Sequence, residues 1–273
     1  MTDQRAAAQH LRELHRPGNP VVFVNVWDAA SARIVESLGF EAIATTSAGV
    51  AFSEGYPDGE RIGMVNMLAA ISRVCRAVDV PVSADLEGGY GETVDEAIGC
   101  AKGAIAAGAA GLNFEDGKDE SRLLDARVQA GRIAAMRRVC DDYGVPLVIN
   151  ARTDVFLAEI GPAEGRMREA IARGRLYREA GADCIFVPAV TQPELVAELV
   201  RELDAPLNVL AGATAPPVAE LARLGVSRIS YGSNAYLQAL TAFRDLAKQI
   251  RERGTLDARP ASIGWSEANA LFD

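Results

Sequence analysis

Short apolar runs alternate with longer amphipathic stretches along most of the chain. Short β-branched runs are typical of buried strands, and apolar positions three and four residues apart are typical of helices. The pattern predicts strands at residues 21–26, 42–46, 82–86, 111–115, 147–151, 183–187, 207–210 and 228–231. It predicts helices over residues 64–78, 94–107, 126–143, 163–180 and 194–203, among others. Successive strand–helix units of this number favour an α/β fold, the (β/α)8 TIM-type barrel.

A repeated pattern before the strands supports this prediction. Four glycines each stop a predicted helix shortly before the next strand: Gly39, Gly108, Gly181 and Gly225. The intervening strands are instead preceded by a proline, at Pro81, Pro146 and Pro206. The glycine and proline patterns alternate from the second strand to the eighth. We therefore expect one barrel domain over residues 1–273, without a linker.

Both ends of the chain add segments to the predicted barrel. Residues 2–15 are expected to form a helix that covers the barrel floor. A turn-like break at residues 255–260 precedes a short helix near residues 268–272. Residues 255–273 carry the apolar side chains Ile263, Trp265, Leu271 and Phe272. This segment is expected to pack on its own barrel or on a neighbouring subunit.

Composition excludes several classes of function. The net charge of −9 argues against nucleic acid and against an anionic membrane surface as partners. No apolar run approaches the length of a membrane span, and the N-terminus has no apolar core typical of a secretory signal. The four cysteines have no paired spacing, which is typical of reduced thiols in a cytoplasmic protein. His10 and His15 are the only histidines, so a histidine-based metal site or triad is not expected.

Carboxylates gather where predicted strands end, which is where barrel enzymes place their chemistry. Asp85 and Glu87 share one face at the end of the third strand, and Glu115 ends the fourth. Unneutralised, the three would repel one another, and their pKa values would rise. A hard cation such as Mg²⁺ resolves that conflict. The alternative is that Arg152 and water neutralise them without a metal.

Other strand ends indicate a site for a 2-oxo acid. The stretch Ser47-Ala48-Gly49 is expected to open a loop whose backbone N–H groups cradle a carboxylate or an oxyanion. Arg152 ends an otherwise apolar strand and offers a fork that matches a carboxylate. Trp27 and Asn208 lie at the ends of the first and seventh strands. The polar stretch at residues 117–122 is either a lid over the site or a solvated loop.

Taken together, six stretches resemble the isocitrate lyase and phosphoenolpyruvate mutase superfamily. They cover about the first two thirds of the chain, and they are Asn25-Val26-Trp27-Asp28, Thr46-Ser47-Ala48-Gly49-Val50, Gly55-Tyr56-Pro57-Asp58, Asp85-Leu86-Glu87-Gly88-Gly89-Tyr90-Gly91, Asn113-Phe114-Glu115-Asp116 and Asn150-Ala151-Arg152-Thr153-Asp154. The resemblance implies a Mg²⁺-dependent barrel, with Mn²⁺ as a possible substitute, that works through a pyruvate enolate. It also implies a homo-oligomer, a dimer or a tetramer, in which a C-terminal helix swaps between subunits.

The resemblance further implies roles for individual residues. Asp85 would hold the metal, and Glu87 and Glu115 would assist through water. The substrate-binding set would be Trp27, Thr46, Ser47, Ala48, Arg152 and Asn208. By its matching position, Asp58 would lie near the metal site. The residues selected as catalytic are Asp58, Arg152, Tyr90 and Lys118, of which Tyr90 and Lys118 are selected as candidate proton donors and not from the resemblance. The proton donor to the enolate is left open between Tyr90, Lys118 and water.

Departures from the superfamily pattern leave the reaction open. The stretch after Glu115 has neither the cysteine nor the histidine of the lyase loop, and Phe186-Val187-Pro188-Ala189 lacks the lyase glutamate. The favoured function is a Mg²⁺-dependent lyase that cleaves a C–C bond at C3 of a small 2-oxo or 2-hydroxy acid. Such an enzyme would be an oxaloacetate decarboxylase or resemble methylisocitrate lyase. The alternatives are a phosphonopyruvate mutase or hydrolase that acts on a C–P bond, and a non-catalytic binder of a 2-oxo acid.

Overall fold

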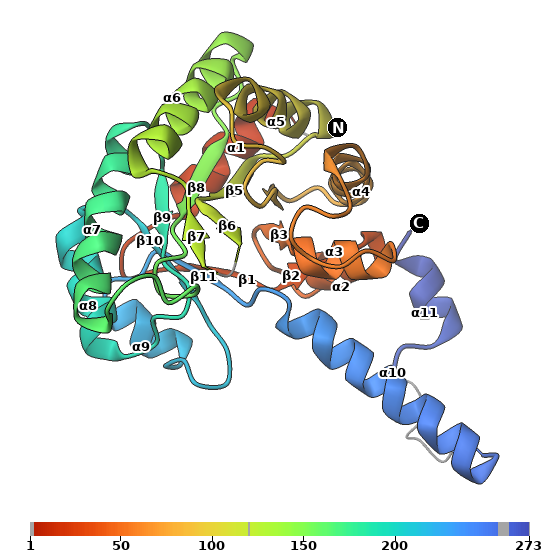
Figure 1. Cartoon of the computed structure of the whole chain (residues 1–273). Helices are drawn as coiled ribbons and strands as arrows, with labels where there is room; N and C mark the ends of the chain where they lie inside the picture. Colours follow the sequence, from red (N-terminus) through yellow and green to blue (C-terminus); the bar gives the residue numbers. More distant parts are fainter. Residues whose placement is uncertain (1–2, 120, 256–261, 273) are drawn as a thin grey trace.

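The computed structural model describes residues 3–119, 121–255 and 262–272. Its main sheet is a parallel (β/α)8 barrel, as predicted (Figure 1). The strands are β1 Val21–Phe23, β2 Asn25–Val26, β3 Ile43–Thr45, β4 Val82–Asp85, β5 Gly111–Glu115, β8 Val148–Arg152, β9 Cys184–Phe186, β10 Leu207–Leu210 and β11 Arg228–Ser230. The predicted first strand is split into β1, which pairs with β11, and β2, which pairs with β3. These two segments bring the ends of the sheet together.

Helices surround the sheet and follow the predicted stretches closely. They are α1 Gln4–Leu14, α2 Ala29–Ser37, α3 Ser47–Ser53, α4 Met64–Ala77, α5 Val94–Ala107, α6 Ala126–Tyr143, α7 Ala163–Glu179, α8 Pro193–Leu203, α9 Val218–Arg223, α10 Asn234–Arg253 and α11 Trp265–Ala270. A capping box of Thr93 and Glu96 begins α5, and Gly108 ends it with a left-handed φ of 92°. The predicted loop at Ser47 is instead α3, because the Thr46 side chain caps a helix there.

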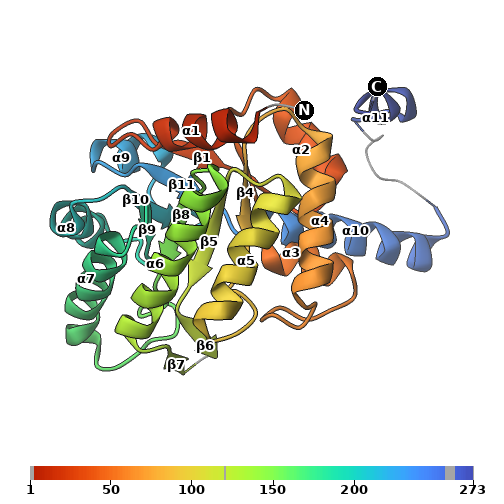
Figure 2. The ribbon, with the colours of Figure 1, turned by 90° about the horizontal axis from the view of Figure 1, so that it is seen from above.

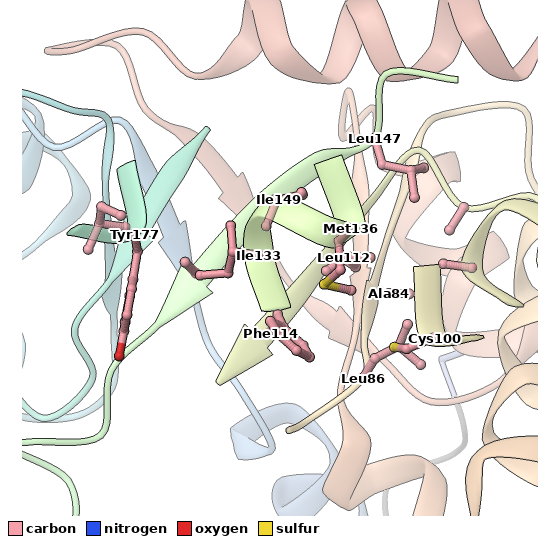
Figure 3. Packing of buried hydrophobic residues seen from close by; sticks show 14 of the residues in the cluster. Ala84, Leu86, Cys100, Leu112, Phe114, Ile133, Met136, Leu147, Ile149 and Tyr177 are labelled. Atoms are coloured by element: carbon pink, nitrogen blue, oxygen red, sulfur yellow. The ribbon is translucent and has the colours of Figure 1, made fainter. Parts of the chain in front are cut away.

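The hydrophobic core lies between the sheet and the outer helices. Leu112, Phe114 and Ile149 point outward from their strands and pack against Ile133 and Met136 of α6 (Figure 3). Alternate strand residues face the barrel interior, and many of these are polar and almost completely buried: Ser83, Asp85, Asn113, Asn150, Asn208 and Arg228. The interior of this barrel is thus a polar layer that leads to the carboxyl ends of the strands.

Helix α1 closes the floor of the barrel, as predicted. Ala8, Leu11 and Leu14 pack with Phe23 and Val148 at the amino ends of the strands. Figure 2 shows α1 at one end of the barrel and the hairpin of β6 Gly117–Asp119 and β7 Arg122–Leu123 at the other. The floor is therefore sealed, and ligands must enter from the hairpin end.

His15, directly after α1, is buried in this floor. Its Nδ1 lies 2.7 Å from the Leu11 carbonyl oxygen, so Nδ1 carries the proton and donates. Burial, followed by the charge of Arg228, lowers the pKa of His15 from 6.5 to about 3. The folded protein therefore keeps this imidazole neutral at pH values where the unfolded chain binds a proton.

We expect His15 to make the fold sensitive to acid. Between pH 6.5 and about 3 the unfolded state binds the extra proton, so stability falls as pH falls. The slope is up to about 1.4 kcal/mol per pH unit, and the effect vanishes above about pH 7. His15→Gln keeps a donor for Leu11 and lacks this titration. Urea unfolding between about pH 7.5 and pH 5 should show the wild type losing stability relative to His15→Gln; a constant difference would contradict the prediction.

The C-terminal part extends away from the barrel. Helix α10 projects outward, and α11 follows it (Figure 1). The predicted short helix is found slightly earlier, as α11, and the predicted break falls mostly on residues 256–260, outside the described residues. The Arg33 side chain of α2 donates to the Leu271 carbonyl. In the described part of the chain, no helix has the length and apolar character needed to cross a bilayer.

Candidate active site

Two adjoining cavities open at the carboxyl ends of the strands. The outer one, of about 610 Å³, is lined among others by five predicted site residues: Asp58, Glu87, Glu115, Lys118 and Arg152. The inner one, of about 140 Å³, contains six: Thr46, Ser47, Ala48, Asp58, Asp85 and Arg152. Asp58 and Arg152 border both cavities. The structure thus brings together most of the residues chosen from the sequence.

Asp85 is fixed at the inner cavity by contacts to three neighbouring elements. Its Oδ2 accepts from the Ser47 N–H at the start of α3 (2.9 Å), and its Oδ1 accepts from Asn113 Nδ2 (3.3 Å). Its own N–H donates to Thr45 Oγ1 (2.8 Å). Only 9% of Asp85 is exposed. The carboxylate is therefore held in one orientation, and one of the amides expected to bind a ligand instead binds Asp85.

Glu87 lies in a strained loop beside Asp85. Its Oε2 accepts from the Glu60 N–H (2.7 Å), and its Oε1 accepts from Tyr90 OH (3.2 Å). Glu60, Glu87 and Tyr90 all have left-handed φ angles, which non-glycine residues adopt at a cost and mostly at functional sites. Burial, and then the Asp85 charge, raises the pKa of Glu87 from 4.5 to about 8.

Arg152 is engaged by two carboxylates of its own chain. Its Nε and Nη2 donate to the two oxygens of Asp154 (2.5 and 3.0 Å). Its Nη1 lies 2.7 Å from Glu115 Oε2, a close ion pair without the alignment of a hydrogen bond. Burial nevertheless raises the pKa of Glu115 above its usual range. The fork expected to bind a substrate carboxylate is thus held by Asp154, and a ligand must compete for it or approach from another side.

Three carboxylates of the site are not in direct contact with a cationic side chain in the part of the chain that the structure describes. In the described chain, Asp58, Asp85 and Glu87 form no salt bridge, since Arg152 pairs with Glu115 and Asp154. Burial, followed by the Asp85 charge, also raises the pKa of Asp58. Arg152 therefore neutralises only part of the negative charge, and the alternative without a metal, in which Arg152 and water share this role, leaves the rest to water.

This donor set fits a hydrated hard cation. No three acidic, histidine or cysteine side chains of the described residues converge closely enough to enclose an ion by themselves. Mg²⁺ usually takes one or two carboxylates and keeps several waters. Asp85 as a direct ligand, with Asp58, Glu87 and Glu115 reached through water, agrees with that preference. Oxygen donors of this kind also accept Mn²⁺.

Three predicted site residues lie outside the lining of the two cavities. Trp27 packs edge-to-face on Tyr236, with ring centroids 5.1 Å apart. Asn208 is fully buried, and its Oδ1 accepts from Ser230 Oγ (2.9 Å). Tyr90 reaches the site through its bonds to Glu87 and Glu60, since its hydroxyl donates to Glu87 and its N–H donates to Glu60. Their predicted roles stay predictions, and the structure gives Asn208 a place beneath the inner cavity.

In the stretch predicted as a lid or a solvated loop, the described residues include the two strands of the β6–β7 hairpin. Lys118 Nζ donates to the Gly91 carbonyl (3.0 Å), and Arg122 pairs with Glu92 (3.2 Å). The Leu124 N–H donates to the Asp116 carbonyl (2.8 Å), which fixes the base of the hairpin. The hairpin therefore rests on the glycine loop that follows Glu87 and places Lys118 at the outer cavity.

Sequence analysis did not select several residues that shape the site. Glu60 contacts both Glu87 and Tyr90, since its Oε1 accepts from the Tyr90 N–H (2.6 Å). Asp154 accepts from the Arg152 guanidinium and fixes its position, and Asn113 donates to Asp85 and orients it. Asp154 and Asn113 carried a detectable signal, because each lies at a strand end inside a recognised stretch. Glu60 lies in a loop, and no pattern in the sequence indicates its partners.

Comparisons with known proteins agree with the fold and with the superfamily expected from the sequence. The model of the family "Phosphoenolpyruvate phosphomutase" matches residues 11–251. An uncharacterized protein of Mycobacterium tuberculosis is 34% identical over 260 residues, covering 94% of both chains. An oxaloacetate decarboxylase of Pseudomonas entomophila is 29% identical over 255 residues, covering 88% of this chain and 83% of that protein. A crystal structure from Burkholderia cenocepacia J2315, described as a candidate lyase or mutase, superposes with a TM-score of 0.89 at 36% identity, covering 98% of this chain and 96% of that one.

The predicted superfamily is therefore confirmed by sequence and by structure. The match to the family model extends over most of the chain, and the superposed structure shares the fold over nearly its whole length. This chain belongs to the phosphoenolpyruvate phosphomutase family, within the isocitrate lyase and phosphoenolpyruvate mutase superfamily.

Proposed function

We propose that this protein is a Mg²⁺-dependent lyase that cleaves a C–C bond at C3 of a small 2-oxo or 2-hydroxy acid. The observation that carries the proposal is the group of carboxylates at the two cavities. Asp85 and Glu87 are buried, Asp58 is exposed beside them, and none of the three forms a salt bridge with the residues that the structure describes. They border cavities whose inner part suits a molecule of a few carbon atoms. Two adjacent buried carboxylates, Asp85 and Glu87, are costly in their charged forms unless a cation balances them.

In this proposal each side chain of the site has a distinct role in binding the cation or the acid. Asp85 would hold the cation directly, and Asp58, Glu87 and Glu115 would bind its water shell. A bound Mg²⁺ supplies Lewis-acid stabilisation of negative charge on a keto oxygen. Thr46, Ser47 and Ala48 line the inner cavity and would orient the acid. Arg152 adds positive charge there, and Asp154 and Glu115 keep its plane fixed.

The substrate that best suits the inner cavity is oxaloacetate. Breaking its C3–C4 bond releases CO₂, leaves the electron pair in a pyruvate enolate, and requires no acid during bond breaking. The wall contributed by Leu157, Phe186, Pro188 and Leu210 is apolar, and poor solvation of the departing carboxylate favours its loss. A relative bearing the name oxaloacetate decarboxylase supports the same choice. Protonation at C3 then requires a donor, and Lys118 lies at the outer cavity.

Pyruvate formation from oxaloacetate tests this function. We expect turnover that requires Mg²⁺ or Mn²⁺ and stops with excess chelator, because the carboxylate cluster would lose its cation. Methylisocitrate, other 2-hydroxy diacids and phosphonopyruvate serve as competing substrates in the same assay. The uncatalysed metal-dependent decay of oxaloacetate, measured without protein, is the blank. Equal pyruvate formation with and without the enzyme would contradict the proposal.

Cleavage of a C–P bond is the second candidate. Relatives named phosphoenolpyruvate phosphomutase and phosphonopyruvate hydrolase favour it, as does the Lys118 ammonium at the outer cavity. In this structure Arg122, the other cation of the β6–β7 hairpin, pairs with the exposed Glu92. Phosphate release or new ³¹P signals from phosphonopyruvate would identify this chemistry. Binding of a 2-oxo acid with no turnover of any substrate would instead identify a non-catalytic binder.

We also propose that the chain forms homo-oligomers through its C-terminal part. Exposed apolar side chains lie on or beside α10 and α11. They are Leu237, Leu240, Phe243, Ile250, Ile263, Trp265 and Phe272. Trp265 is 81% exposed, which is costly for an indole in water. Truncation after Gly254 removes the last three of these side chains. The truncated chain should show a lower assembly mass in light scattering than the full chain, and an unchanged mass would contradict the proposal.

A further inference from the structure

Arg228 is a completely buried arginine inside the barrel that no part of the proposed chemistry uses. It begins β11, and its guanidinium carbon lies 4.4 Å from the centroid of the Phe23 ring. It forms no salt bridge with the residues that the structure describes, and its Nε and Nη1 have no hydrogen-bond partner. Burying a charge in this way is costly, so its position requires a reason other than packing.

The one bonded nitrogen of Arg228 points toward the site. Nη2 donates to Ser83 Oγ (3.1 Å) and to Asn113 Oδ1 (3.3 Å). The same Asn113 oxygen accepts from Asn150 Nδ2 (2.7 Å). With Oδ1 held by two donors, the amide nitrogen of Asn113 must face the other way, where it donates to Asp85 Oδ1 (3.3 Å). One amide thus connects the buried cation to Asp85.

Electrostatics agrees with this connection. Burial lowers the pKa of Arg228 to about 10, while Cys184 and Asp85 act in the opposite direction. Burial raises the pKa of the Cys184 thiol to about 12, so Cys184 carries no charge at neutral pH. Of these two groups, only Asp85 therefore provides a negative charge to balance Arg228.

We propose that Arg228 is a positioning residue for Asp85, acting through the side-chain amide of Asn113. The inference rests on the proposed function, because it concerns the affinity of Asp85 for a cation. Arg228 keeps the Asn113 amide in the orientation that donates to Asp85, and its charge polarises that amide. The carboxylate is then presented to the cavity in a fixed orientation. Partners of this kind, one step removed from a metal, commonly change its affinity by 10- to 100-fold.

The test compares Mn²⁺ binding, measured by electron paramagnetic resonance of free Mn²⁺, with thermal unfolding. Arg228→Met should weaken Mn²⁺ binding about tenfold. Its melting temperature should not fall, because methionine removes two unpaired buried donors while keeping much of the volume. Should the methionine variant not fold, Arg228→Gln provides a neutral polar replacement with the same expected loss of affinity.

Two comparisons separate positioning from general stability. In an Asn113→Ala background, Arg228→Met should cause no further loss of Mn²⁺ affinity, because the connecting amide is gone. The control is Arg137→Met, a half-buried arginine of α6 that donates to the Gly181 and Leu147 carbonyls. That variant should lower the melting temperature and leave Mn²⁺ affinity unchanged.

The outcomes distinguish this inference from the proposed function. If Arg228→Met or Arg228→Gln binds Mn²⁺ with wild-type affinity while Asp85→Asn no longer binds it, the inference is overturned and the proposed function is not. The inference is also overturned if Arg228→Met lowers Mn²⁺ affinity as much in the Asn113→Ala background as it does in the wild type. A wild-type protein that binds no Mn²⁺ overturns the proposed function and, with it, this inference.

Discussion

Asp85→Asn should abolish pyruvate formation while leaving the barrel folded. Asparagine has the size of aspartate, and its oxygen can still accept from the Ser47 N–H, as Asp85 Oδ2 does. It lacks the negative charge that would hold the cation directly. Losing a Lewis acid worth several kcal/mol corresponds to a fall in kcat of roughly 10³-fold or more. Steady-state assays with oxaloacetate and saturating Mg²⁺ measure this effect.

Stability distinguishes this result from misfolding. In metal-free buffer, Asp85→Asn should still unfold in one cooperative transition. Removing one of three mutually repelling carboxylates offsets part of the cost of losing the Asn113 bond and the charge that balances Arg228. The matched control is Asp204→Asn, on an exposed side chain with a left-handed φ that asparagine tolerates well. That variant should keep full activity. Wild-type turnover by Asp85→Asn would rule out a metal held by this residue.

Arg152→Met should lower both stability and activity. The substitution leaves Glu115 and Asp154 without the cation that now pairs with both. Removing one member of a buried ion pair typically costs about 3–5 kcal/mol. Activity should fall by about 10²-fold or more, because positive charge at the inner cavity is lost. Urea unfolding and oxaloacetate assays on the same preparation measure the two effects.

The loss of stability should depend on pH. Burial already raises the pKa of Glu115, and without Arg152 this side chain should bind a proton more readily still. The deficit in the free energy of unfolding should therefore shrink from about pH 7 to about pH 5. Arg201→Met, on a side chain that is 68% exposed, is the control and should change stability by less than about 0.5 kcal/mol. A pH-independent deficit would argue against the ion pair as its cause.

Local signals explain why the fold could be predicted from the sequence. The bounds of β5, β10, α5 and α6 agree with prediction, because glycine and proline mark where strands begin and Thr93 with Glu96 caps α5. The split of the first strand could not be predicted, since it depends on which neighbours β1 and β2 pair with. Helix α3 was missed for a different reason: it is short, and its mostly small residues carry no amphipathic pattern.

The sequence predicted which residues meet at the candidate site only where their positions at strand ends determine this. Asp85, Glu87, Glu115 and Arg152 meet because parallel strands bring their carboxyl ends together. The ion pair between Asp154 and the Arg152 guanidinium depends on side-chain conformation, and the spacing of residues in the sequence does not reveal it. The bond between Glu60 and the Tyr90 backbone joins residues 30 positions apart, in two loops. Contacts of this kind belong to the folded chain and leave no local pattern.

The polar barrel interior has a consequence for how this scaffold changes over evolution. The apolar layer that stabilises the fold lies outside the sheet, whereas the reactive layer lies inside it. A substitution at an inward position therefore alters charge and shape at the site without opening a void in the main core. Away from ion-paired positions such as Arg152, stability and chemistry can then change largely independently. The same architecture can then exchange one bond-breaking reaction for another in small steps, as relatives named as mutases, lyases and hydrolases illustrate.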